Sequence, residues 1–355
     1  MKLAKVAGIV IVALVLLIGG FLWKTYRDAG EFKSIKAHGP EGCRTVSGVD
    51  SSEDITIDAR SAMAFISSDD RRPWFHGKKG KQGAIYGYNL RPNRPRLINL
   101  TRNFEKEFHP HGIGLYAAPS GTTYVFVVNH VGGKQYIEIF ELTGDRLHHK
   151  ETVSGPLMSS PNDVLPVGPR KFYVTNDHGS ASMLGRKLED YLQLARSYVL
   201  YFDGEQFKKV AEGLKYANGI NISPDGKTIY VASTTGKAVY LYHRNKADGT
   251  LRFVRKISVG TGVDNIEIDT QGRVWLGCHP KLLTFVKYAN DPKKRSPSQV
   301  LMIKVIKEGK DEIKEVYLNN GNPISGSSVA AYFHGKLLIG SVFDPKFTIC
   351  QLDGY

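Results

Sequence analysis

A short pattern of polar and apolar positions recurs along the chain. In 263–280 the polar pair Asp264 and Asn265 opens an alternating apolar stretch, and a turn at 269–272 leads into a second one. Two alternating stretches joined by a short glycine-containing turn predict an antiparallel hairpin. Five more stretches follow the same plan, at 53–67, 111–129, 162–176, 218–233 and 327–342.

The spacing of these six hairpins predicts an all-β fold. The copies recur roughly every 45 to 63 residues, close to the blade period of a β-propeller. Blades are small antiparallel sheets that pack around a central axis. We therefore expect a six-bladed β-propeller in which the residues that open equivalent strands point toward the axis from one end.

These opening residues predict a shared polar site, although a local explanation exists for each one. Asn and Asp side chains commonly hydrogen-bond the backbone just before a strand. That explanation suffices for one position, but polar openings at six equivalent positions favour a common metal or proton site. The residues expected to be neighbours are Glu53, Asp54, His111, Asn162, Asp163, Asn218, Asp264 and Asn265.

The amino-terminal segment is apolar from Val6 to Trp23 and follows Lys2 and Lys5. Its length is at the lower edge of what spans a bilayer. An uncleaved signal-anchor is the favoured interpretation, and a cleaved signal that releases a secreted protein is the alternative. Either one exports the rest of the chain to the periplasm, cell exterior or secretory lumen. The expected division is a signal-anchor or transmembrane segment at 1–31 and a propeller domain at 32–355.

The charge of the chain bears on whether it binds nucleic acid or a membrane. The 355 residues carry a formal net charge of +14, which raises the question of nucleic-acid binding. The basic residues are spread along the chain and no nucleic-acid motif is present, so we expect no nucleic-acid partner. The clusters at 78–81 and 293–295 predict solvated loops, or contact with an anionic membrane surface.

Three cysteines are present, and two of them flank the predicted ring. A bridge between Cys43 and Cys350, permitted in an exported chain, would tie the two ends of the propeller together. Cys278 is then left over on a predicted strand. We expect a buried free thiol there, because the alternative, a catalytic thiolate, needs an activating base that the sequence does not supply.

One stretch in the middle of the chain departs from the β pattern. Apolar residues at helical spacing predict a helix over 183–201. A helix inserted between strands at the mouth of a propeller can cover a site. Simple packing on the domain surface is the alternative.

Several motifs carry a resemblance to a known family. The motifs from Cys43 onward include SEDITI (52–57), HPHGI (109–113), FVVNH (126–130), VGPRKFYVTNDHG (167–179), ANGINISPDGKTIYVA (217–232) and VDNIEID (263–269). With these motifs in this order the chain resembles the paraoxonase/arylesterase family, whose members are six-bladed propellers with two calcium ions in a central tunnel. The resemblance thus agrees with the repeat and names the ion.

The resemblance implies a specific set of calcium ligands. It implies a catalytic calcium held by Glu53, Asn162, Asn218, Asp264 and Asn265, and a structural calcium held by Asp54, Asp163 and the backbone carbonyl of Ile113. Carboxylate, amide and carbonyl oxygens are the donors that this hard cation prefers. The family's cysteine bridge maps onto Cys43 and Cys350.

The resemblance also implies calcium-dependent hydrolysis of lactones and aryl esters. His111 and His130 match the family's histidine pair, which makes His111 the first candidate for the general base. Asp264 or Glu53 is a rival base, because a metal-bound carboxylate lies nearer to a metal-bound substrate.

Departures from the family concern the substrate rather than the metal. The loop at 69–80 is strongly basic, and Asp344 stands where the family has a histidine. The apolar helix at the mouth favours lipophilic lactones. The alternatives are a non-catalytic, calcium-stabilised binding propeller and a sugar-lactone hydrolase of the related propeller group. The native substrate and the oligomeric state are left open.

Overall fold

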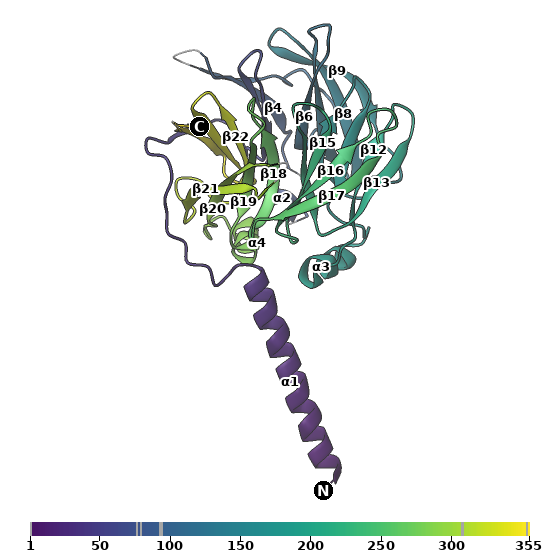
Figure 1. Cartoon of the computed structure of the whole chain (residues 1–355), viewed down its shortest axis with the longest axis vertical. Coiled ribbons are helices and arrows are strands. Elements are labelled where there is room, and N and C mark those ends of the chain that lie inside the picture. The colour runs from purple at the N-terminus through teal and green to yellow at the C-terminus, as the bar shows by residue number, and fades with distance from the viewer. Residues whose placement is uncertain (1, 76, 79, 92–94, 307–308, 353) are drawn as a thin grey trace.

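The computed structural model describes residues 2–75, 77–78, 80–91, 95–306, 309–352 and 354–355. Within these ranges the chain forms six four-stranded antiparallel sheets. The innermost strand of each sheet contacts the innermost strands of the sheets on both sides, so the six sheets close into a ring. The predicted six-bladed β-propeller is confirmed (Figure 1).

The strands follow the chain from the inside of each blade to its outside. Blade 1 contains β2 (Asp54–Asp58), β3 (Met63–Ser68), β4 (Ala84–Asn89) and β5 (Leu97–Asn99), and blade 2 contains β6 (Pro110–Ala117), β7 (Thr123–Val131), β8 (Lys134–Thr143) and β9 (Arg146–Val153). Blade 3 contains β10 (Pro161–Pro166), β11 (Phe172–Asn176), β12 (Ser197–Phe202) and β13 (Phe207–Leu214), and blade 4 contains β14 (Ala217–Ile222), β15 (Thr228–Ser233), β16 (Ala238–Arg244) and β17 (Leu251–Ser258). Blade 5 contains β18 (Gly262–Ile268), β19 (Val274–His279), β20 (Ser298–Lys304) and β21 (Glu312–Asn319), and blade 6 contains β22 (Ser327–Phe333), β23 (Lys336–Ser341), β24 (Lys346–Gln351) and β1 (Arg44–Ser47).

Blade 6 joins the two ends of the propeller chain. Its outermost strand is β1, which pairs antiparallel with β24, so the first strand of the chain completes the last sheet. The disulfide between Cys43 and Cys350 crosses this closure, and the predicted bridge is confirmed. Cys278 is free and fully buried. Burial raises the pKa of its thiol well above the ordinary value, which disfavours a catalytic thiolate.

The hydrophobic core lies between the blades. Among the described residues, six of the seven clusters of buried apolar side chains each contain residues of two neighbouring blades. Alternate residues of a strand point to opposite faces of its sheet, so one apolar set packs on each neighbour. This packing holds the inner strands in fixed positions around the axis.

Five of the six inner strands have a register shift at the same place. In each, pairing with the second strand of the blade skips two residues, which is the pattern of a β-bulge. The skipped pairs are 111–112, 162–163, 218–219, 264–265 and 328–329. Bulges re-aim side chains and are common beside active sites. Candidate site residues occupy four of these five bulges.

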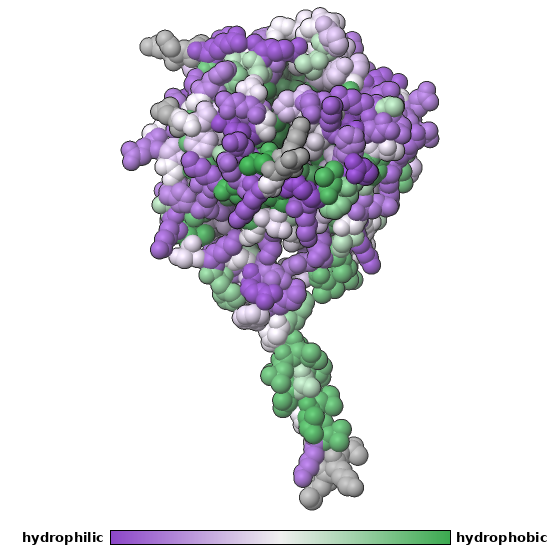
Figure 2. Space-filling view, in the orientation of Figure 1, coloured by the Kyte–Doolittle hydropathy of each residue, from purple (hydrophilic) through white to green (hydrophobic). Residues whose placement is uncertain are grey.

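Four helices are described: α1 (Lys2–Asp28), α2 (Arg72–Phe75), α3 (Met183–Leu192) and α4 (Leu282–Asn290). Helix α1 projects away from the propeller, and its apolar surface contrasts with the largely hydrophilic face of the body seen in Figure 2. Among the described residues, α1 is the one helix long and apolar enough to cross a membrane. Met1, where the predicted 1–31 segment begins, lies outside the described residues.

Specific contacts dock the end of α1 on the propeller. The Leu282 N–H donates to the Ala29 carbonyl at 2.9 Å, and Lys237 Nζ donates to the Asp28 carbonyl at 3.0 Å. The Glu31 carboxylate accepts hydrogen bonds from the Thr284 N–H and hydroxyl. Helices α3 and α4 lie at this same end of the propeller in Figure 1.

The helix predicted over 183–201 is wrong in its second half. Helix α3 ends at Leu192, because Gln193 takes a left-handed conformation and its N–H caps the last turn. The segment Ser197–Phe202 is instead strand β12, paired on both sides within blade 3. Its alternation of aromatic and branched residues suits a strand better than a helix.

Candidate metal and catalytic site

The openings of the inner strands converge at the axis, and two glycines allow them to approach closely. A Cβ on Gly112 would lie 2.5 Å from the Asp163 Cα, and a Cβ on Gly219 would lie 2.6 Å from the Asn265 Cα. Any larger residue at either position would push neighbouring blades apart. The close approach of β6 to β10 and of β14 to β18 therefore depends on these glycines.

Glu53 lies at the centre of a first group of polar side chains, which also contains Asn162, Asn218, Asp264 and Asn265. Asn265 Nδ2 donates to its Oε1 and to its carbonyl, both at 3.0 Å, and Arg71 Nη2 lies 3.9 Å from its Oε2. His111 Nε2 lies 3.6 Å from its Oε1. Burial opposes ionisation of Glu53, but His111, Arg71 and the Asn265 amide outweigh burial and lower its pKa to about 2. The carboxylate is thus ionised at neutral pH.

Each remaining residue of this group is held by a neighbour outside it. Asn162 Nδ2 donates to Asp177 Oδ2 at 3.2 Å, and Asn218 Nδ2 donates to the Thr234 hydroxyl at 3.0 Å. Asp264 Oδ2 lies 2.7 Å from His279 Nε2. In both asparagines the amide nitrogen is engaged, which leaves the amide oxygen facing the other way.

These oxygens fit a hard cation. Four of them, Glu53 Oε2 and the Oδ1 atoms of Asn162, Asn218 and Asn265, are buried without a hydrogen-bond partner. Buried polar atoms are normally satisfied, so four orphaned acceptors in one place favour a cation as their partner. No group of three or more His, Cys, Asp or Glu side chains with metal-site geometry occurs in the described part of the chain. Three of the four orphaned oxygens belong to asparagine amides, and asparagine is not among these four residue types.

A second pair of carboxylates lies deeper on the same strands. Asp54 Oδ2 accepts the Ile113 N–H, and Asp163 accepts the N–H groups of Val164 and Ile220, at 2.7 to 2.8 Å. Burial, and then the charge of Asp163, raises the pKa of Asp54 well above its ordinary value. Burial likewise raises the pKa of Asp163. Two buried carboxylates that repel each other suit a divalent cation, although backbone donors already satisfy part of this set.

The two candidate catalytic histidines contact each other. His111 Nδ1 lies 2.9 Å from His130 Nε2, and His130 Nδ1 is hydrogen-bonded to Gln135 Oε1. Burial, followed by the neighbouring charges of His111 and Arg71, lowers the pKa of His130 to about 3. His130 is therefore a neutral ring that orients His111, whose Nε2 faces Glu53.

The site includes residues that the sequence did not single out. Asp177 binds Asn162, and also the Ser160 hydroxyl and His178. His178 in turn contacts Asp190 of α3 at 3.0 Å, and the two aspartates outweigh burial to raise the pKa of His178 to about 10. His279 contacts the candidate ligand Asp264 directly, and His178 joins α3 to Asp177, which holds the candidate ligand Asn162.

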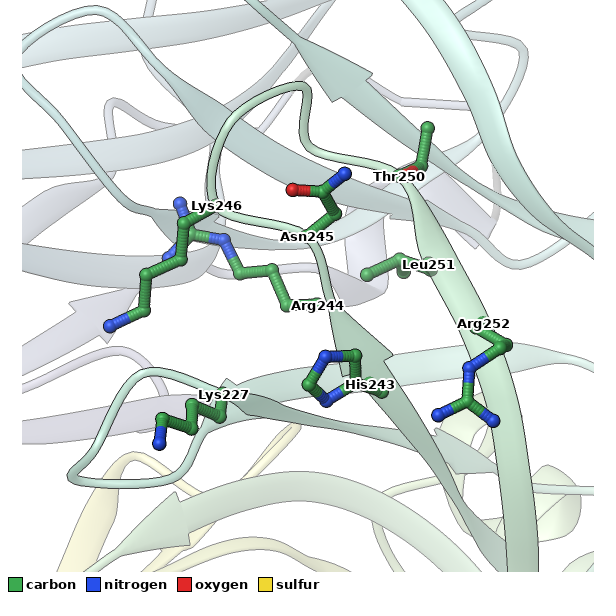
Figure 3. A pocket seen from close by; sticks show the side chains of 8 residues that line it. All are labelled: Lys227, His243, Arg244, Asn245, Lys246, Thr250, Leu251 and Arg252. Atoms are coloured by element: carbon green, nitrogen blue, oxygen red, sulfur yellow. The ribbon is translucent and has the colours of Figure 1, made fainter.

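A basic hollow on blade 4 is separate from this site. It has a volume of about 540 Å³, and its lining comes from the turn before β15 and from the β16–β17 hairpin (Figure 3). Its lining includes Lys227, Arg244, Lys246 and Arg252. None of its residues belongs to an inner strand, so it is not part of the axial site.

The fold and the site together define a six-bladed β-propeller whose axis holds a buried, oxygen-rich polar centre. A family model described as arylesterase matches residues 34–352. Rat serum paraoxonase/arylesterase 2 is 37% identical over 318 residues, covering 87% of this chain and 88% of the relative. Human serum paraoxonase/lactonase 3 is 33% identical over 359 residues, covering 99% and 100%. The chain belongs to the arylesterase family.

A solved structure supports the fold independently. Regucalcin, a calcium-binding protein from Agrobacterium tumefaciens, superimposes with a TM-score of 0.54 at 13% identity, covering 89% of this chain and 94% of that chain. A likeness at this identity establishes the shared architecture.

Proposed function

We propose that this protein is a calcium-dependent hydrolase of lactones and aryl esters. Membership of the arylesterase family supports the reaction class, and relatives named as arylesterases and a lactonase match most of the chain. The observation that carries the proposal is the set of four buried, orphaned oxygens beside the His111–His130 pair. Orphaned acceptors supply a cation site, and the histidine supplies a base within reach of it.

The proposed ligands divide into two sets. Glu53, Asn162, Asn218, Asp264 and Asn265 would hold a catalytic calcium, and Asp54, Asp163 and the Ile113 carbonyl would hold a structural one. Support for the first set comes from the orphaned oxygens, and support for the second comes from the repulsion between two buried carboxylates. Calcium when bound supplies a Lewis acid that polarises the ester carbonyl and stabilises the developing oxyanion.

Side chains of the protein accept a proton from water and return it to the leaving group. His111 Nε2 accepts a proton from the attacking water, and His130 holds the ring through its contact with His111 Nδ1. The same His111 returns the proton to the leaving oxygen when the ester bond breaks. Glu53 or Asp264 is the rival base. Glu53 is ionised at neutral pH, but its low pKa makes it the weaker proton acceptor.

Lipophilic substrates suit the position of the site. The candidate ligand Asn162 is hydrogen-bonded to Asp177, and His178 joins Asp177 to Asp190 of α3. These contacts place the candidate ligands at the end of the propeller that carries α1, α3 and α4. Met183 and Leu184 of α3 are 77% and 71% exposed. Exposed apolar side chains at this end of the propeller favour lactones that partition into a membrane.

The same arrangement supports a membrane-anchored protein. The segment 1–31 would hold the propeller domain 32–355 at the extracytoplasmic surface, consistent with the disulfide. The contacts of Asp28 and Ala29 with the propeller would turn the site toward the membrane. Cleavage of the segment would instead release a secreted enzyme.

Hydrolysis of three substrates by the full-length protein in detergent micelles tests the proposal. An aliphatic δ-lactone, phenyl acetate and a sugar δ-lactone are compared before chelation, after mild chelation and after calcium is restored. We expect the aliphatic lactone to be the best substrate, with activity that falls on chelation and returns with calcium. Preference for the sugar lactone would favour the sugar-lactone hydrolase. Inertness toward all three by a folded, calcium-containing protein would favour the binding propeller.

A further inference from the structure

The hairpin that carries His130 has a register fixed by its turn. Gly132 and Gly133 form a two-residue connection between β7 and β8, with φ of 57° and 79°. Positive φ at both residues is the requirement of a type I′ turn, which glycine meets without strain. The register that follows places Gln135 directly opposite His130. The Gln135 side chain is therefore held beside the imidazole by the backbone.

A chain of two hydrogen bonds runs from Gln135 through His130 to His111. Gln135 Oε1 contacts His130 Nδ1, and His130 Nε2 lies 2.9 Å from His111 Nδ1. An amide oxygen only accepts, so His130 Nδ1 must carry the proton. A neutral His130 then presents a lone pair at Nε2, which accepts the His111 Nδ1 proton. His111 Nε2 is left unprotonated 3.6 Å from Glu53 Oε1, and the positive charge that the ring gains on accepting a proton faces that carboxylate.

The opposite polarity is chemically complete, which makes the orientation of Gln135 decisive. If the amide nitrogen of Gln135 faced His130, each proton would move to the other ring nitrogen. His111 would then direct an N–H at Glu53 and could not accept a proton. The tautomer of a histidine is set by the hydrogen bond at its other nitrogen. Loss of the correct tautomer is severely damaging where a histidine acts as base.

We propose that Gln135 is a positioning residue that fixes the tautomers of both histidines and keeps His111 Nε2 available as the base. This inference rests on the proposed hydrolytic function. Gln135 acts through His130 and does not touch the substrate.

A neutral amide at this position also determines where the proton goes. During hydrolysis the new C–O bond forms as a water proton moves to His111 Nε2. Gln135 carries no titratable proton and offers no carboxylate to stabilise a charged His130. The proton therefore remains on His111 until the ester C–O bond breaks, and then moves to the leaving alkoxide. The products are a carboxylic acid and an alcohol, joined in one hydroxy acid when the substrate is a lactone.

The surroundings of Gln135 allow substitutions without rebuilding the core. Gln135 is half-buried on the wall of a surface hollow of about 420 Å³, which Lys134, Ser154 and Ser159 also line. Lys134 is exposed in the same hollow, one residue away. Gln135→Met keeps the length of the side chain but removes the acceptor. Lys134→Met is the matched control, because it changes the same hollow without facing the imidazole.

The direct test reads the tautomers by ¹⁵N NMR of the full-length protein in detergent with calcium, labelled at histidine and assigned with His111→Gln and His130→Gln. We expect His130 protonated at Nδ1 and His111 unprotonated at Nε2 in the wild type and in Lys134→Met. In Gln135→Met we expect mixed tautomers and a fall in kcat of about 10- to 100-fold, part of the ~10²–10⁴ that a positioned base contributes. KM for the lactone and the calcium content should stay unchanged.

Gln135→Glu separates the role of the acceptor from the role of the neutral amide. The carboxylate keeps the acceptor, so kcat at pH 8.5 should return to within about threefold of the wild type. The added carboxylate also raises the pKa of His130, as Asp177 does, whereas His111 and Arg71 lower it. When the pH is lowered, activity should therefore be lost at a higher pH than in the wild type. A Gln135→Met variant with wild-type kcat, or a wild-type His130 protonated at Nε2, overturns the inference. A wild-type protein with the expected tautomers but no esterase activity would instead refute the proposed function alone.

Discussion

Asn265 donates two hydrogen bonds to Glu53, one to the backbone carbonyl and one to Oε1, both at 3.0 Å. The two residues are 212 positions apart in the sequence and belong to blades 5 and 1. Their contact passes across the start of blade 6, where the Ser328 hydroxyl donates to the same Glu53 carbonyl. The hydrogen bonds between Asn265 and Glu53 leave Asn265 Oδ1 and Glu53 Oε2 without a hydrogen-bond partner and available to the proposed cation.

Asn265→Asp should destabilise the calcium-free protein strongly and the calcium-loaded protein much less. The change removes two donors and sets a second carboxylate against Glu53, a loss on the order of 3 kcal/mol without the ion. Calcium would offset the added charge. Thermal unfolding with and without calcium measures this, and Asn221→Asp, on an inner strand but outside the ligand set, serves as control. An equal loss in both conditions would argue against a cation at Asn265.

The stabilising effect of calcium should grow as pH rises. Without a cation, the pKa of Asp54 and that of Asp163 are raised by burial, so the folded state binds protons that the unfolded state has lost above about pH 3.9. The calcium-free fold therefore loses stability as pH rises through the raised pKa values. Calcium replaces those protons. We expect a larger difference in Tm between loaded and calcium-free protein at pH 8 than at pH 5, with protons released on binding.

Asp54→Asn is the control for that pH dependence. It removes one of the two repelling carboxylates, so the calcium-free variant should change less with pH than the wild type. A Tm difference independent of pH in the wild type would contradict the assignment of these carboxylates to an ion.

Removal of the Cys43–Cys350 disulfide should lower stability without touching the site. The bridge closes a loop with a sequence separation of 307 residues, for which the loop-entropy model gives about 5 to 6 kcal/mol and measured losses are commonly ~2–5. The variant Cys43→Ser/Cys350→Ser should therefore unfold at lower urea, matching the reduced wild type. Unchanged midpoints in both samples would show that the β1–β24 pairing alone secures the ring.

Replacement of His111 distinguishes the rival bases. If His111 is the base, His111→Gln should lower kcat for an aliphatic lactone about 10²-fold or more, while calcium content stays at the wild-type value. His130→Gln should cost less, because His111 remains. A loss below tenfold for His111→Gln would transfer the role to Glu53 or Asp264. His149→Gln, outside the site, controls for general effects of histidine loss.

Much of this architecture was predictable because the hairpins recur at similar spacing. Alternating residues, with a glycine turn in five of the six copies, indicated all six inner hairpins, and the resemblance supplied the ion and its ligands. The bulges were not predictable, since a register shift depends on which partner strand is present. Helix α3 ended early because pairing within blade 3 overrides the helical spacing after Leu192.

Gln135 could have been found from the sequence. The Gly132-Gly133 pair is a strong signal for a two-residue turn, and such a turn places His130 opposite Gln135. The contact of Asn162 with Asp177 was harder to foresee. It depends on the chain beyond β11 returning to the start of β10, where Ser160 and Asp177 also meet.

The central claim is that calcium at the orphaned oxygens makes this propeller a hydrolase. Calcium content and aliphatic lactone hydrolysis, measured on the same full-length samples along a chelator titration, test it most directly. We expect two bound ions, with activity lost and regained in proportion to the more weakly held one while the protein stays folded. Asn218→Leu should lack that ion and its activity. Full activity in folded protein that retains less than one calcium ion per chain would contradict the account.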